Sequence, residues 1–310
     1  AYLQGSYTIG DFTALAGVRY EHTAVSSEAF RAQGSTLTPV SNEGAYGNWL
    51  PSVHLRWDVL PDLTLRAAWT NTIGRPDYAS IAANENLGFD GSQPVLSRGN
   101  PSLRPRKSEG WDASIEYYTG GGVLSVGLFA KNIDDEIFSL TSVQPLNIRG
   151  MVEDVIVTTP TNAESAEIRG IELNVQQQLA FLPGALGGLG ISANATFLDT
   201  EFTFLTAVGP RVTGLFLQPD STANATVFYQ SGPFEGRVSW NFIGGFLETI
   251  NDTIPNADQY WEDRSTFDAN ISYRVTRSLT VYAEGQNLSD AGRREVTGPG
   301  RTFLQESAEY

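Results

Sequence analysis

Apolar and polar residues alternate one by one over long segments of this chain. Residues 63–70 read LTLRAAWT, and residues 111–117 read WDASIEY, with an apolar residue at nearly every second position. This period of two is that of a β-strand with one apolar and one polar face, and helical spacing fits none of these segments. We therefore expect an all-β protein.

The links between these segments alternate strictly in length. Short links are predicted at 9–11, 59–62, 119–122, 180–188, 231–233 and 276–278, and long ones at 23–46, 73–107, 134–165, 200–218, 246–262 and 290–301. A soluble sandwich with Greek-key connections has no reason to keep that order. An antiparallel transmembrane β-barrel does, because short periplasmic turns alternate with long extracellular loops.

Twelve complete strands follow from this pattern, each about 10–12 residues long, as a tilted bilayer crossing requires. They are predicted at 2–9, 11–22, 47–58, 62–72, 108–119, 122–133, 166–179, 189–200, 219–230, 234–245, 263–275 and 279–289. A thirteenth begins near 302–310, but Glu306 shares the parity of Leu304 and Tyr310, so it makes a poor closing strand. We expect a partial barrel of 12–13 strands, cut at both ends.

Charge and composition support this interpretation. Most charged residues in the strands lie on the polar parity, and exceptions such as Glu109, Glu167 and Arg169 lie at the strand ends nearest the long loops. Trp and Tyr gather near the strand ends, as in the aromatic girdles of membrane barrels. The net charge of −15 argues against a nucleic-acid partner. Without cysteine, disulfides, thiolate nucleophiles and Cys-ligated zinc are excluded.

Four segments are distinctive: TNTIGRPDYASI (70–81), RGNPSLRPRKSEGWDASIEYY (98–118), SAEIRGIELNVQQQL (165–179) and LTVYAEGQNLSD (279–290). They resemble segments in the barrel of TonB-dependent outer-membrane receptors. In that family the barrel has ~22 strands and a plugged lumen. The resemblance implies that residues 1–310 are part of an outer-membrane barrel domain, with the plug domain and the last strand missing.

The resemblance also implies a function. Such receptors capture scarce ligands, iron–siderophore-type chelates or in some branches carbohydrates, and import them with energy from a TonB-type complex acting on the plug. Outer-membrane lipid and lipopolysaccharide would surround the barrel. Two alternatives remain from the residues: a passive porin or autotransporter-type translocation barrel, and a soluble secreted β-protein that binds glycans.

The long link 73–107 carries the candidate ligand-binding residues. Its last ten residues, 98–107, hold four positive charges and no acid, which suits an anionic ligand because guanidinium groups bind carboxylate and phosphate oxygens in pairs. Contact with lipopolysaccharide, or a purely structural role for the Pro-containing segments, is the competing interpretation. The candidates are Arg75, Asp77, Tyr78, Arg98, Asn100, Arg104 and Arg106.

Other polar groups favour structural roles. The acidic link 134–165 matches no calcium-loop spacing, so a solvated face is the preferred interpretation over Ca²⁺ binding. An amide-rich lumen wall suits contact with a plug, and it could also bond sugar hydroxyls; it comprises Asn174, Gln176, Gln178, Asn194, Asn224, Asn241 and Asn270. His22 and His54 have no metal-ligand spacing, and no Gly-x-Ser-x-Gly elbow occurs. We expect no enzymatic activity, metal or cofactor.

Overall fold

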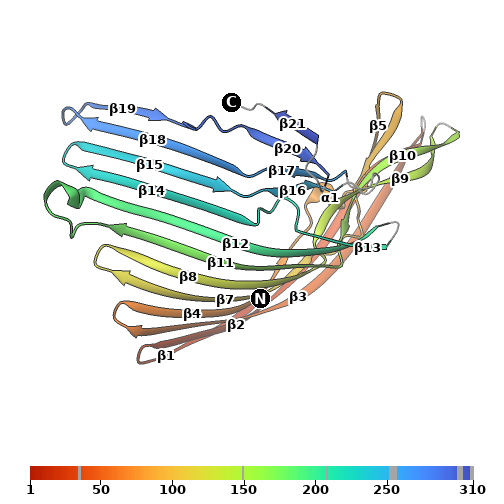
Figure 1. Ribbon diagram of the computed structural model, residues 1–310. Coiled ribbons are helices and arrows are strands. Elements are labelled where there is room, and N and C mark those ends of the chain that lie inside the picture. The colour runs from red at the N-terminus through yellow and green to blue at the C-terminus, as the bar shows by residue number, and fades with distance from the viewer. Residues whose placement is uncertain (34–35, 149, 207–208, 251–256, 299–302, 308–310) are drawn as a thin grey trace.

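The computed structural model describes residues 1–33, 36–148, 150–206, 209–250, 257–298 and 303–307. Its main element is one curved antiparallel sheet, whose strands follow each other in chain order across Figure 1. The strands on this path are β1 (Tyr2–Ile9), β2 (Phe12–Gln33), β3 (Thr36–Leu60), β4 (Leu63–Gly74), β7 (Arg106–Thr119), β8 (Gly122–Asp134), β11 (Ser165–Gln178), β12 (Leu189–Thr206), β14 (Ser221–Ser231), β15 (Phe234–Ile243), β18 (Arg264–Arg274) and β19 (Thr280–Gly285). A short strand, β13 (Gly209–Thr213), pairs beside β12.

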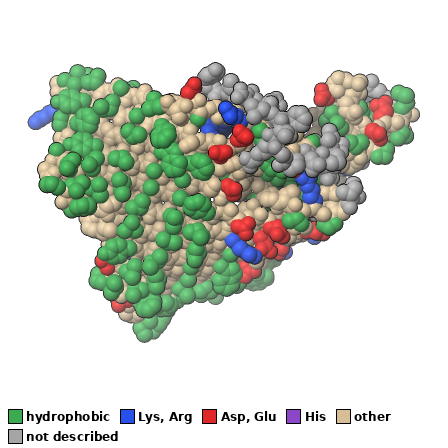
Figure 2. All heavy atoms as spheres, viewed as in Figure 1, with side chains coloured by type: hydrophobic (Ala, Val, Ile, Leu, Met, Phe, Trp, Pro, Cys, Tyr) green, Lys and Arg blue, Asp and Glu red, His purple; other side chains and the backbone are tan. Residues whose placement is uncertain are grey.

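The twelve strands on the path are the twelve that the alternation predicts, and the expected all-β fold is confirmed. Short turns lie at one end of the sheet and long connections at the other, as Figure 1 shows. Apolar side chains on one parity stay exposed, among them Leu128, Val227 and Val238, because no second layer covers them. Hydrophobic side chains accordingly cover much of the sheet surface in Figure 2. This is the expected lipid-facing surface.

Four predicted strand boundaries are wrong by more than two residues. The link 23–46 is not a loop: β2 continues to Gln33 and β3 starts at Thr36, and the two pair throughout this extension. The alternation fades there because a strand beyond the bilayer needs no apolar face, while backbone pairing continues. Strand β12 likewise extends to Thr206, and β19 ends at Gly285 because Asn287 turns the chain with a positive φ of 46°.

The predicted thirteenth strand lies outside the main sheet. Strand β21 (Phe303–Ser307) pairs with β20 (Arg293–Thr297), and not with β19. Together with β16 (Phe246–Thr249) and β17 (Gln259–Trp261), these strands form a small sheet beside the long connections. Residues 302 and 308–310 of the prediction lie outside the described residues.

A second small sheet forms within the links predicted as loops. It has the order β5–β6–β10–β9 and comprises β5 (Glu85–Asp90), β6 (Gln93–Arg98), β9 (Ile137–Ile148) and β10 (Met151–Asn162). A four-residue helix, α1 (Tyr78–Ile81), precedes it. Strands β6 and β10 are parallel, with Leu96 opposite Val157, so two connections far apart in sequence share one sheet.

The buried cores lie at the loop end of the main sheet, where the long connections pack against the extended end of β12 that carries Phe202 and Phe204. One cluster packs Phe138 against Phe202 and Phe204, with ring centroids 5.1–5.3 Å apart. The other comprises Leu96, Val155 and Val157. The chain is therefore a membrane sheet with a packed loop assembly at one end. No helix in the described part of the chain is long and apolar enough to cross a membrane.

Candidate functional site

Two long connections meet at the loop end of the sheet. The stretch from the end of β6 to the start of β7, residues 98–106, lies against residues 135–136 and 159–162 around β9 and β10. The first segment is basic and the second holds acidic residues. Opposite charges on the two segments therefore bring the connections together.

Two ion pairs join these segments. The guanidinium of Arg104 lies 2.5 Å from Asp135 Oδ1, and Arg106 Nη1 donates to Glu136 Oε1 at 3.0 Å. Glu136 is only 7% exposed, and its Oε2 has no hydrogen-bond partner among the described residues. A carboxylate buried in this way depends on its one cationic partner. Arg106 thus has a structural role in addition to any contact with a ligand.

Backbone and amide groups complete the junction. Asn162 accepts from the Arg104 amide at 2.9 Å and donates to the Arg104 carbonyl at 3.0 Å. Asn100 Nδ2 donates to the Pro160 carbonyl at 3.0 Å. Arg98 donates to Thr159 Oγ1 at 3.1 Å and to Gln144 Oε1 at 3.3 Å. Four of the seven predicted residues (Arg98, Asn100, Arg104 and Arg106) therefore belong to one loop assembly.

The other three candidates lie on the segment before β5. Asp77 is the N-cap of α1 and accepts from the Ser80 amide at 2.7 Å and the Ser80 hydroxyl at 2.8 Å. These bonds hold the pKa of the Asp77 carboxyl below its ordinary value, the backbone bond contributing most. Tyr78 is 89% exposed. The Asn100 amide donates to the Ser80 carbonyl at 2.6 Å, which links α1 to the assembly.

Arg75 points to a different partner. It forms an ion pair with Glu21 on β2 and donates from Nε to Thr23 Oγ1 at 3.1 Å. Glu21 also pairs with Arg19 at 2.5 Å, so one carboxylate serves two guanidinium groups. Arg75 therefore fixes its loop to the wall of the sheet rather than joining the other six candidates.

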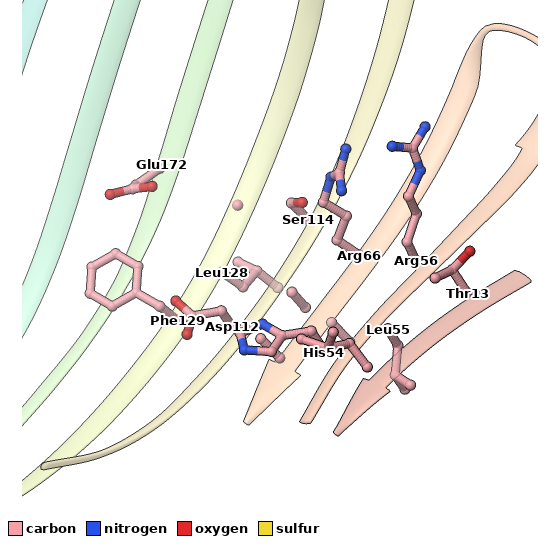
Figure 3. A pocket seen from close by; sticks show the side chains of 15 residues that line it. Thr13, His54, Leu55, Arg56, Arg66, Asp112, Ser114, Leu128, Phe129 and Glu172 are labelled. Atoms are coloured by element: carbon pink, nitrogen blue, oxygen red, sulfur yellow. The ribbon is translucent and has the colours of Figure 1, made fainter. Parts of the chain in front are cut away.

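The polar face of the main sheet carries a charged hollow of about 480 Å³. Figure 3 shows Arg56 and Arg66 on neighbouring strands pointing the same way, with Asp112 and Glu172 farther across the wall. Arg66 Nε donates to Glu116 Oε1 at 2.9 Å, and Arg56 pairs with Asp58 at 2.9 Å. Asp112 and Glu172 have no ion-pair partner among the described residues. The hollow therefore offers unpaired carboxylates beside paired guanidinium groups.

These hollow residues were not among the sequence candidates. Each lies on the polar parity of its strand. Parity predicts the face on which a residue lies, but it does not predict which residues of neighbouring strands are opposite each other. The register supplies this: Arg56 is opposite Arg66, Arg66 opposite Ser114, and Glu172 opposite Gly127. Cross-strand register was the missing signal.

A row of four asparagines crosses the other half of the wall. Asn174, Asn194, Asn224 and Asn241 stand opposite one another on β11, β12, β14 and β15. Asn224 Nδ2 donates to Asn194 Oδ1 at 3.0 Å, and Asn241 Nδ2 donates to Asp268 Oδ2 at 2.8 Å. Four residues of the predicted amide wall thus form one continuous, uncharged strip.

An antiparallel sheet with an exposed apolar face, a polar opposite face, short turns at one end and long connections at the other defines an outer-membrane β-barrel wall. Residues 1–288 match the family model described as TonB dependent receptor-like, beta-barrel, and the chain belongs to that family. The proteins of this family reside in the Gram-negative outer membrane and are transporters, not enzymes. The resemblance inferred from the sequence is confirmed.

Solved structures share the fold. The unliganded ferric citrate transporter FecA is 15% identical with a TM-score of 0.67, and 99% of this chain covers 42% of that one. The ferric yersiniabactin uptake receptor FyuA from Yersinia pestis is 15% identical with a TM-score of 0.66, at coverages of 94% and 40%. The copper transporter OprC is 18% identical with a TM-score of 0.65, at 93% and 41%. The chain therefore spans about two fifths of each of these proteins.

Proposed function

We propose that the chain forms barrel wall and loops of an outer-membrane receptor that captures a scarce ligand and imports it with TonB-coupled energy. The observation that carries this proposal is the loop assembly around Arg98, Asn100, Arg104 and Arg106. It presents an ordered polar surface at the loop end of a sheet whose polar wall continues below it. The ligand would first bind at the loops and then pass along the polar wall.

An iron–siderophore-type chelate is the ligand class that we favour. The side chains of Arg104 and Arg106 remain more than half exposed although each pairs with a carboxylate. A guanidinium has five N–H donors, so one carboxylate partner leaves others for an anionic chelate. Structures that share the fold include a ferric citrate transporter and a ferric yersiniabactin uptake receptor, which adds support for this class.

A carbohydrate is the second candidate, and the asparagine row favours it. Each carboxamide both donates and accepts hydrogen bonds, as a sugar hydroxyl does. The side-chain hydrogen bonds of the row use only part of that capacity, since the Asn174 side chain has no hydrogen bond to any described residue. The same strip also suits contact with the plug domain that the family resemblance implies.

Three partners belong to this proposal. A TonB-type complex would deliver energy through the plug domain. Outer-membrane lipid and lipopolysaccharide would contact the exposed apolar face, where Trp57 and Trp111 lie half exposed near the strand ends. The third partner is the small-molecule ligand itself.

Uptake measurements test the proposal. The complete receptor is expressed in cells that lack competing receptors, with and without a functional TonB protein, and given radiolabelled ferric citrate, ferric yersiniabactin or maltohexaose. We expect concentrative uptake of one probe only when TonB functions. Uptake that persists unchanged without TonB would instead indicate a passive barrel and overturn the proposal.

A pair of variants tests the role of the loop assembly. Arg104→Ala should weaken binding of an anionic chelate by about tenfold, because it removes a charge-assisted contact worth ~1.5 kcal/mol. Arg277→Ala is the matched control, since Arg277 lies in the short turn between β18 and β19 at the opposite end of the sheet. If both variants weakened binding equally, the ligand would not bind at the loop assembly.

A further inference from the structure

One short turn differs from the others in length and chemistry. The connection between β11 and β12, residues 179–188, has ten residues and reads LAFLPGALGG, whereas the other five short turns have two to five. We refer to it as the apolar turn. The others contain Asp11, Asp62, Arg277 or pairs such as Gly120–Gly121. No Asp, Glu, Lys or Arg occurs from residue 173 to residue 198.

The apolar turn exposes its large side chains. Phe181 is 76% exposed and Leu186 is 53% exposed. Pro183 and Ala185 are exposed as well. Scattered single apolar residues on a surface need no explanation, but a contiguous exposed group without charges usually marks an interaction surface.

The backbone of the turn is well held. A 3₁₀ turn, η1 (Gly184–Gly188), forms its second half, and the Leu182 amide donates to the Leu179 carbonyl at 2.9 Å. The Gln178 side chain donates to the carbonyls of Gly187 and Leu189, each at 3.0 Å. The exposed side chains are thus presented from a fixed backbone and not from a loose loop.

The turn continues the lipid-facing surface. The Leu179 amide donates to the Leu189 carbonyl at 2.8 Å, and Leu189 stands opposite Tyr229 on β14. A Cβ added to Gly188 would lie 3.1 Å from the Tyr229 ring, so the turn packs directly against this aromatic side chain. The Tyr229 ring lies 5.8 Å from the Phe234 ring between centroids, tilted by 55°, at the end of the exposed apolar face near the short turns.

We propose that the apolar turn inserts into the headgroup region of the inner, phospholipid leaflet of the outer membrane. Short turns of such barrels lie on the periplasmic side. Phe and Leu side chains on an uncharged backbone segment partition to this interface, typically ~5–10 Å into the boundary between headgroups and acyl chains. The turn would then act as a fixed lipid contact beneath β11, β12 and β14.

A periplasmic protein is the competing occupant, and two observations favour the lipid. The turn is directly continuous with the lipid-facing residues Leu189 and Tyr229. It also carries no charge that could pair with a protein partner, because no Asp, Glu, Lys or Arg lies within the segment 173–198.

Spin labels at single cysteines test the proposal directly. Residues 1–310 contain no cysteine, so Phe181→Cys and Leu186→Cys each introduce a single site here, and any cysteine elsewhere in the complete receptor is replaced by serine. The complete receptor is reconstituted in vesicles of phosphatidylethanolamine and phosphatidylglycerol. Collisions of the label with oxygen, which concentrates in lipid, are compared with collisions with a water-soluble nickel chelate.

Two reference sites calibrate the result. Val227→Cys labels the exposed apolar face of β14, and Ser278→Cys labels the turn between β18 and β19. We expect the ratio of oxygen to nickel collisions at 181 and 186 to approach that at 227 and to exceed that at 278 several-fold. A ratio equal to that at 278 would place the turn in water and overturn the proposal.

Low collision rates with both oxygen and the nickel chelate would also overturn the proposal of lipid insertion. If both collision rates at 181 and 186 fell far below those at the two references, the side chains would be covered by protein and not by lipid. Ala185→Cys provides an additional site should one large-residue variant fail to fold, and heat-modifiable gel mobility identifies folded receptor. Because the experiment measures membrane depth only, it is independent of which ligand the receptor carries.

Discussion

The main sheet and the loop assembly place the same kind of residue in opposite environments. In the loop assembly, which includes the end of β12 beyond residue 200, Val155 and Phe202 are completely buried. In the main sheet, Leu128 and Val238 are each 54% exposed. Both regions are β-sheets from one chain, so the difference lies in the solvent that each region meets.

That difference shows how each region is stabilised. The loop assembly buries its own aromatic core and pairs its charges, as a water-soluble domain does. The main sheet has no second layer, so lipid takes the place of a core and hydrogen bonds between neighbouring strands satisfy the backbone. Substitutions of similar chemistry should therefore have different effects in the two regions.

The largest effect is expected in the loop core. Phe202→Ala should lower the free energy of unfolding by about 3–5 kcal/mol, because it leaves a cavity beside Phe138 and Phe204. Urea unfolding of the complete receptor in detergent measures the change. The control is Leu205→Ala on the same strand, which is exposed and should change stability by less than about 0.5 kcal/mol. Similar losses in both variants would contradict a packed loop core.

A charge on the lipid-facing surface should have the next largest effect. Leu128→Arg should cost about 2–4 kcal/mol in a bilayer, since a guanidinium near the midplane loses its hydration. Ser125→Arg on the same strand is the control, because Ser125 lies on the polar face opposite Glu116. Unfolding in lipid vesicles should separate the two variants clearly. If Ser125→Arg is the more damaging, the assignment of the two faces is reversed.

The sequence predicted the main sheet well because the bilayer imposes a simple rule. Every crossing strand must alternate and must have a similar length, so twelve strands could be located without any knowledge of pairing. The rule ends at the membrane boundary. Along the extension of β2 from residue 23 to Gln33 the regular apolar alternation ends, so the sequence predicts a loop although the backbone stays paired with β3.

The candidate site was predicted only in part, for a related reason. The basic segment 98–107 and the acidic segment 134–165 were interpreted separately, the first as a surface for an anionic ligand and the second as a solvated face. In the structure, Arg104 and Arg106 of the first pair with Asp135 and Glu136 of the second. Contacts between segments this far apart depend on the parallel pairing of β6 with β10, which no local pattern indicates.

Breaking one of these ion pairs should have an intermediate effect. Arg106→Ala should cost about 1–3 kcal/mol, because it leaves the buried Glu136 carboxylate without its cation. Adding Glu136→Gln should restore part of the loss, since a neutral amide is cheaper to bury than a carboxylate. Hydrogen exchange of the β9 and β10 amides reports the local change. A double variant that is no more stable than Arg106→Ala alone would show that the pair has no role in the assembly.

The smallest effect is expected at the helix cap of Asp77. Its pKa is lowered by the hydrogen bonds from Ser80, so its contribution to local stability is complete above the ordinary carboxyl pKa and is lost as pH falls through the lowered value. Because Asp77 is exposed, this contribution should be at most about 0.5 kcal/mol. Asp77→Asn keeps a side-chain oxygen for the cap but does not titrate. The protection of the Ser80 amide, corrected for its intrinsic exchange rate, should therefore fall in acid for the original protein and stay constant for Asp77→Asn. The same acid dependence in both proteins would assign the loss to another group.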